Sequence, residues 1–199
     1  MYNRLSIVTR SNVQVLDLDQ VKAHLRVFTD DDDDLITAYI GAATDYIDGV
    51  WGIGVSLLTT QWRYTLDYFQ QVMRIPIGPV QSVDAIEYRD TTNVWNTVDP
   101  TLYYVDLSRS PACINLSYNK VYPQVTLPQG SAVRITFTAG YGATPASIPR
   151  DIQYAMLLMI GSYYENRSAI VGIESRDSPA ELPLGVEAIL SKYRIIGIA

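Results

Sequence analysis

The sequence predicts an α+β protein, in which N-terminal and C-terminal helices form one bundle around an inserted antiparallel β domain. Apolar residues recur at spacings of three and four in both terminal parts, which is typical of amphipathic helices. Between residues 58 and 139 the spacing changes to two and prolines separate short runs, as in a small sandwich or open barrel. The predicted divisions are therefore 1–57, 58–139 and 140–199.

Two helices are expected in residues 1–57. A short one covers 20–26, and a longer one follows the five aspartates Asp30–Asp34, which suit the first turn of a helix. Its apolar stripe runs from residue 35 to residue 50. Gly52 and Gly54 are expected to end this helix.

The inserted segment contains seven short runs that read as strands. The pair around Asp90–Asn93 predicts a hairpin with a four-residue loop. The expected strands are 61–68, 72–76, 85–89, 94–98, 102–105, 112–116 and 132–138.

Two more helices are expected after residue 140. The first carries Pro149 in its first turn, and its segment 155–160 is apolar all round, so it should be buried on most sides. Residues 168–183 predict a flexible loop, and a last amphipathic helix covers 184–195.

Composition and charge restrict the function. The net charge of −6 comes mostly from residues 1–58, and the 15 Lys and Arg residues form no cluster that could grip phosphates. No apolar run approaches the roughly 18 residues that a membrane-spanning helix needs. We therefore expect neither specific nucleic-acid binding nor a membrane partner, and we expect synthesis in the cytoplasm.

No catalytic, cofactor or metal site is expected. Asp30–Asp34 fail the calcium-loop pattern, because Leu35 stands where glycine is needed and Gly41 where glutamate is needed. His24 is the single histidine and Cys113 the single cysteine, and no local signature supports a catalytic pair of the two. The protein is expected not to be an enzyme.

Tyrosine is frequent, with 15 Tyr against 3 Phe and 3 Trp. Its apolar ring and polar hydroxyl suit protein–protein interfaces, and tyrosine also favours strands. Both interpretations stay open at this point.

Eight blocks of sequence share their residues, order and spacing with one known family. They are 21–27, 34–43, 60–67, 75–83, 133–142, 148–155, 163–167 and 182–194. On these blocks the chain resembles the head–tail connector (adaptor) proteins of tailed phages, in the branch with a β insertion. Residues 48–51 depart from the pattern of many relatives.

The resemblance implies a structural protein of a phage or prophage virion, without catalytic residues or cofactors. It implies a ring of usually twelve copies in the neck, below the portal protein, which extends the DNA channel towards the tail. Implied partners are further copies of the chain, the portal protein, other neck or tail-completion proteins, and DNA that passes without specific binding. Assembly would take place in the host cytoplasm.

The C-terminal segment is a candidate for docking to the portal. An apolar helix that follows a loop of sixteen residues can become ordered on a partner, or it can pack back on the bundle. The candidate docking residues are Leu184, Val186, Ile189, Leu190, Tyr193, Ile195 and Ile196.

An alternative function is a monomeric β-sandwich binding module that reads carbohydrate or a host surface. An aromatic groove formed by Trp62, Tyr64, Trp95 and Tyr103 would support this alternative.

Overall fold

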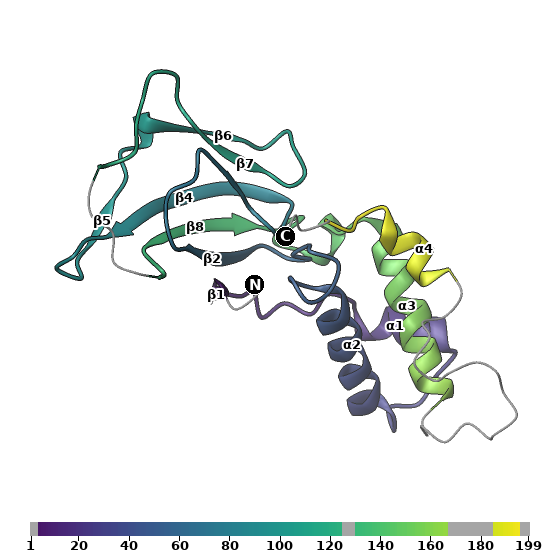
Figure 1. Ribbon diagram of the computed structural model, residues 1–199. Helices are drawn as coiled ribbons and strands as arrows, with labels where there is room; N and C mark the ends of the chain where they lie inside the picture. The colour runs from purple at the N-terminus through teal and green to yellow at the C-terminus, as the bar shows by residue number, and fades with distance from the viewer. Residues whose placement is uncertain (1–3, 125–129, 167–184, 196–199) are drawn as a thin grey trace, which may run out of the picture.

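The computed structural model describes residues 4–124, 130–166 and 185–195, and it shows a helical lobe beside a β lobe (Figure 1). Each lobe has its own cluster of buried apolar side chains. The α+β class predicted from the sequence is therefore confirmed.

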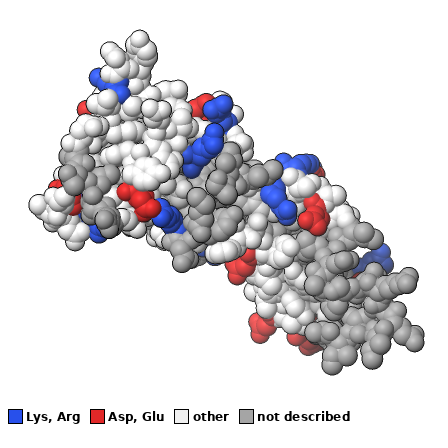
Figure 2. Space-filling model, in the orientation of Figure 1, with Lys and Arg blue, Asp and Glu red and all other residues white. Residues whose placement is uncertain are grey.

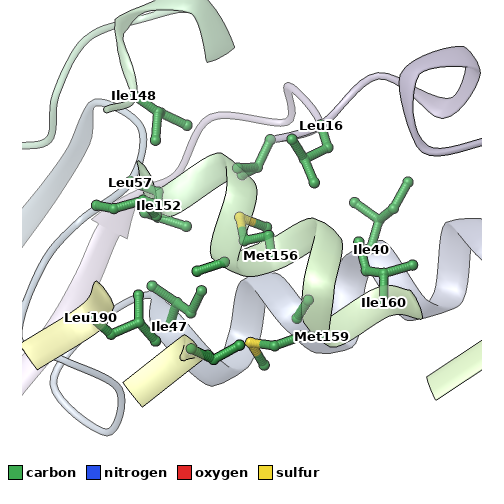
Figure 3. Packing of buried hydrophobic residues seen from close by; sticks show 14 of the residues in the cluster. Leu16, Ile40, Ile47, Leu57, Ile148, Ile152, Met156, Met159, Ile160 and Leu190 are labelled. Atoms are coloured by element: carbon green, nitrogen blue, oxygen red, sulfur yellow. The ribbon is translucent and has the colours of Figure 1, made fainter. Parts of the chain in front are cut away.

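The helical lobe contains four helices: α1 (Leu18–Leu25), α2 (Asp33–Ile47), α3 (Arg150–Glu165) and α4 (Val186–Ser191). Helix α3 is central, because it packs against each of the other three. Its buried side chains Ile152, Met156 and Met159 meet Ile47 of α2 and Leu190 of α4 in one apolar core (Figure 3). Helices from both ends of the chain thus share this core.

Helix α2 ends at Ile47, earlier than the apolar stripe suggested. The chain turns back over the helix end, and the Ile53 N–H donates to the Ile47 carbonyl oxygen at 3.2 Å. A Cβ atom on Gly52 would lie 2.1 Å from that oxygen, so only glycine permits this close approach. Gly52 therefore acts in the turn that follows the helix.

The β lobe contains two antiparallel sheets. The first has the order β1-β2-β8-β4-β5, with β1 (Leu5–Thr9), β2 (Thr60–Leu66), β8 (Val133–Ala139), β4 (Val80–Arg89) and β5 (Trp95–Thr97). The second has the order β3-β7-β6, with β3 (Val72–Arg74), β7 (Cys113–Leu116) and β6 (Tyr103–Asp106). Ile86 and Phe137 of the first sheet share one core with Met73 and Ile114 of the second. Of the two predicted forms, the structure shows two packed sheets, as in a small sandwich.

Strand β1 was not predicted, because residues 1–57 were interpreted as helical throughout. It pairs antiparallel with β2, with Leu5 opposite Tyr64 and Ile7 opposite Trp62. The five residues Leu5–Thr9 contain Ile, Val and Thr, which favour strands, and this was the available signal. The N-terminal segment thus begins in the β lobe and crosses to the helical lobe only afterwards.

The two lobes meet at a seam formed by residues 48–59, 78 and 140–149. Ser56 N–H donates to the Gly78 carbonyl oxygen at 2.7 Å, and Gly78 N–H donates to the Gly54 carbonyl oxygen at 3.0 Å. Thr60 lies opposite Ala139 in the β2–β8 pair, so the two ends of the inserted segment are adjacent.

Replacing residues 58–139 by a short Gly-Ser linker, together with removal of residues 1–9, is expected to leave a soluble helical protein. The adjacent ends need only a short connection, and of the buried residues of the helical core only Leu58 is lost. The far-UV circular dichroism spectrum measures the outcome. Loss of the helical signal would show that the helical lobe depends on the β lobe. A second variant that keeps residues 1–9 shows how much stability is lost when β1 has no partner strand.

Candidate assembly surfaces

Helix α3 separates two surfaces of the helical lobe. Its side chains Ile152, Ala155 and Met159 are buried, and Tyr163 packs on Tyr39 of α2 with ring centroids 6.0 Å apart. With 100° per residue, Arg150, Tyr154 and Leu158 project from the opposite side of α3, away from α2. The exposed side of α2 and this side of α3 therefore face in opposite directions.

The first surface is a groove between α2 and the N-terminal segment. A cavity of about 300 Å³ is lined by residues 10–15, by Thr37, Gly41, Thr44 and Asp45 of α2, and by neighbouring seam residues. A second cavity of about 300 Å³ adjoins it and is lined by β1, the seam and Trp62. Ile7 and Val13, which line these cavities, are 44% and 49% exposed. The groove is thus open and partly apolar.

An ion pair separates the two cavities. Arg10 Nη2 lies 3.1 Å from Asp48 Oδ2 and 3.4 Å from Asp45 Oδ1. Burial raises the pKa of the Asp48 carboxyl above its ordinary value, although the Leu57 N–H and Arg10 oppose this effect. Leu57 N–H donates to Asp48 Oδ1 at 2.8 Å. These contacts hold the N-terminal segment beside the end of α2.

The aspartate-rich turn lies at the far end of the helical lobe. Lys22 Nζ lies 2.7 Å from both Asp30 and Asp33, and these hydrogen bonds raise the pKa of the Lys22 ammonium and lower that of Asp30. Tyr164 donates its hydroxyl to Asp32 at 2.5 Å. Among the described residues no group of His, Cys, Asp or Glu is arranged to hold a metal ion. The turn is thus tied to α1 and α3.

The proposed docking residues lie largely in the helical core. Val186 and Leu190 are 0% and 1% exposed, and Ile189, Tyr193 and Ile195 pack against the same core while staying partly exposed. Leu184 and Ile196 lie outside the described residues. The structure therefore shows α4 in the arrangement in which it packs back on the bundle.

Polar contacts also hold the α4 segment in place. Lys192 forms an ion pair with Asp151 of α3, which lowers the pKa of the Asp151 carboxyl. Tyr193 donates its hydroxyl to the same carboxylate at 3.3 Å, and Ile195 N–H donates to the Ile53 carbonyl oxygen at 2.8 Å. The outward side of α4 keeps Glu187, Ala188 and Ser191 exposed.

The open face of the larger sheet carries arginines that are engaged within the sheet. Arg134 donates to both oxygens of Glu87 at 2.7 and 2.8 Å, and this pairing lowers the pKa of the Glu87 carboxyl. The Arg134 guanidinium also lies 4.0 Å from the centroid of the Trp95 ring. Figure 2 shows basic and acidic side chains interspersed on the visible face. No phosphate-binding row of cations is visible there.

The four aromatic residues of the alternative function do not line one groove. Trp62 is buried, Tyr64 and Tyr103 pack against the β core, and Trp95 lies beside Arg134. His24 and Cys113 are not brought together either: His24 lies on α1 near Gly161, and Cys113 is buried in β7 of the other lobe. No helix among the described residues is long and apolar enough to span a membrane.

The fold of the chain is similar to that of neck proteins in solved virion particles. The chain has the fold of a chain in the structure "Neck of native GTA particle computed with C12 symmetry", where GTA stands for gene transfer agent. The TM-score is 0.75 and the sequence identity is 26%, and the match covers 98% of this chain and 97% of that one. It is also similar to chains of the neck of the empty particle computed with C6 symmetry (TM-score 0.74, 24% identity) and of the native virion (0.71, 24%), with the same coverage. These chains are structural parts of virion particles, which is consistent with a place in the virion neck.

A family model matches about the first half of the chain. Residues 15–111 match the model of the family described as phage gp6-like head-tail connector protein, so the resemblance to head–tail connectors that the sequence blocks showed is confirmed. No curated protein matches the chain.

Proposed function

We propose that the protein is a head–tail connector that forms a ring of twelve copies below the portal and extends the DNA channel towards the tail. The observation that carries this proposal is the similarity of nearly the whole chain to a neck chain whose structure was computed with C12 symmetry. The match to the connector family supports the same function. In this function the protein positions other proteins and DNA and performs no chemical reaction.

The charge of the chain suits a channel that DNA passes without binding. The net charge is −6, and on the open sheet face Arg134 is engaged with Glu87 and Trp95, and Arg89 also lies over Trp95. An acidic wall repels phosphates at short range and does not retain the DNA. Further neck or tail-completion proteins would bind the ends of the ring.

The ring is tested by measuring the mass of the purified protein in solution and imaging it by negative stain. We expect the purified protein to form rings at high protein concentration. When portal-bearing particles are present, we expect rings of twelve chains. A protein that stays monomeric both alone and with such particles would contradict the ring. A mass of six or thirteen chains would contradict the copy number only.

The C-terminal segment remains our candidate for the portal contact, now through the outward side of α4. Because Val186 and Leu190 are buried, the side chains available to a partner are Glu187, Ala188 and Ser191, with the exposed parts of Ile189 and Tyr193. Partner contact through exposed positions does not require α4 to leave the bundle.

Ala188→Arg combined with Ser191→Arg is expected to reduce attachment to portal-bearing, DNA-filled capsids at least tenfold. Arginine at these exposed positions blocks close contact, while the buried face of α4 stays unchanged. Co-sedimentation with capsids measures attachment, and circular dichroism and ring images confirm that the variant folds and assembles. Thr91→Arg, at the exposed tip of the β4–β5 hairpin, is the matched control. Undiminished attachment of the double variant would assign the portal contact elsewhere.

A further inference from the structure

Helix α3 carries more apolar surface than its own bundle covers. Tyr154, Leu157 and Leu158 follow the i, i+3, i+4 spacing, on a different side from the buried stripe of Ile152, Ala155 and Met159. Tyr154 is 51% exposed, whereas Leu157 and Leu158 pack partly against the helical core and leave the rest of their surface open. A helix that is apolar all round is normally buried all round. The open side of α3 therefore has the composition of a surface that a partner covers.

The opposite surface of the molecule has a complementary shape. The exposed side of α2 carries the small residues Thr37, Ala38 and Gly41, and Thr37 and Gly41 border the cavity of about 300 Å³ beside residues 10–15. A Cβ atom added to Gly41 would have no atom within 4 Å. A helix can therefore approach α2 closely here, with a large side chain entering the cavity.

The charges of the two surfaces are complementary at the seam end. Helix α2 contains no Lys or Arg, and Asp34 and Asp45 lie on its exposed side. On the open side of α3, Arg150 is exposed at the seam end, and Glu165 is exposed at the other end. The match of opposite charges is thus confined to the seam end, where the α2 surface carries Asp45 and the α3 surface carries Arg150.

We propose that the open side of α3 of one copy packs into the α2 groove of the next copy and that this contact closes the ring. The proposal rests on the proposed ring function, since a cyclic ring needs two different surfaces on each subunit. If the ring axis is parallel to α2 and α3, rotation about this axis does not shift a residue along it. Residues of neighbouring copies can then meet only if they lie at the same level along the axis. Helix α2 ends at the seam and α3 begins there (Figure 1). In such a ring Arg150 would meet Asp45 of the neighbour, and Tyr154 would meet Gly41.

The contact is tested with the cysteine variants Gly41→Cys and Tyr154→Cys. Both positions are exposed, and the natural Cys113 is 3% exposed, so the unmodified chain gives the background. After oxidation or treatment with a short bismaleimide, the double variant should form a ladder of products up to the full ring. Each single variant should give no product, and an equal mixture of the two should give a cross-linked pair only. A control pair, Gly41→Cys with Thr91→Cys, should give no ladder.

Ring images of the same samples distinguish a failure of the proposed α2–α3 contact from a failure of the proposed ring. Rings without a ladder would overturn this contact and leave the ring function standing, and pairs formed by either single variant would also overturn it. Absence of both rings and ladder would overturn the contact together with the ring.

A groove-filling variant gives an independent result. Gly41→Trp adds a large side chain where the single chain has open space, so the thermal midpoint should be unchanged or higher. The fraction of protein in rings should fall at least tenfold, whereas Thr91→Trp should leave it unchanged. Rings that persist in Gly41→Trp would overturn the proposal.

Discussion

Leu190→Ala is expected to lower the free energy of unfolding by about 2–5 kcal/mol, as is typical when a buried leucine is truncated. The Leu190 side chain is 1% exposed and lies in the core that Ile47 and Met159 share (Figure 3). Helix α4 has only six residues, so its position depends on this packing and not on its own helix propensity. Chemical denaturation followed by circular dichroism measures the change.

Ser191→Ala is the matched control for Leu190→Ala. Ser191 is exposed on the same helix, and its replacement should change stability by less than about 0.5 kcal/mol. If Leu190→Ala costs no more than this control, α4 does not pack on the bundle in solution. That result would favour a C-terminal segment that becomes ordered on its partner.

Gly140→Ala is expected to destabilise the protein by more than about 3 kcal/mol, because backbone strain and a backbone clash act together. Gly140 has a φ of +139°, which a residue with a side chain rarely adopts, and it lies at the seam. A Cβ atom there would lie 2.4 Å from the Leu58 carbonyl oxygen and 2.7 Å from the Thr59 nitrogen. Backbone at the junction of the two lobes would have to move, and a thermal melt would show a single transition at a much lower temperature.

Two other glycines separate the causes of this effect. Gly185 also has a positive φ, +102°, but a Cβ atom there meets no atom within 4 Å, so Gly185→Ala should cost only about 1 kcal/mol of strain. Gly41 is helical and equally open, and Gly41→Ala should stabilise the single chain by about 0.5–1 kcal/mol. If Gly140→Ala is no worse than Gly185→Ala, the seam tolerates movement and the contact with Leu58 is loose.

Local patterns were sufficient to predict most elements of the fold. The seven strands between residues 60 and 139 and the four helices appear close to their predicted positions, because period and proline punctuation are local properties. The division into two sheets and the strand order were not predictable, since they depend on long-range pairing such as Tyr88 opposite Val133. Strand β1 was missed because a five-residue edge strand gives only a weak signal beside a helical region.

The surfaces were harder to predict than the elements. The apolar stripe of α4 was recognised, but the same stripe is expected whether it packs on the bundle or on a partner, and only burial distinguishes the two. The apolar run of α3 was expected to be buried on most sides, and the structure leaves Tyr154 half exposed. A sequence pattern shows that a side is apolar and cannot show which molecule covers it.

The unexpected strand β1 changes how the protein would carry mechanical load. Because the chain begins in the β lobe, three covalent connections cross between the lobes, at residues 10–17, 48–59 and 140–149. The hydrogen bonds of Ser56, Gly78 and Ile195 cross-link the same region. A force that pulls the lobes apart is therefore shared among parallel connections, and β1, paired along its length with β2, must slide past its neighbour before the N-terminal connection yields. A joint of this kind resists tension far better than a single hinge, as the proposed connector function would require.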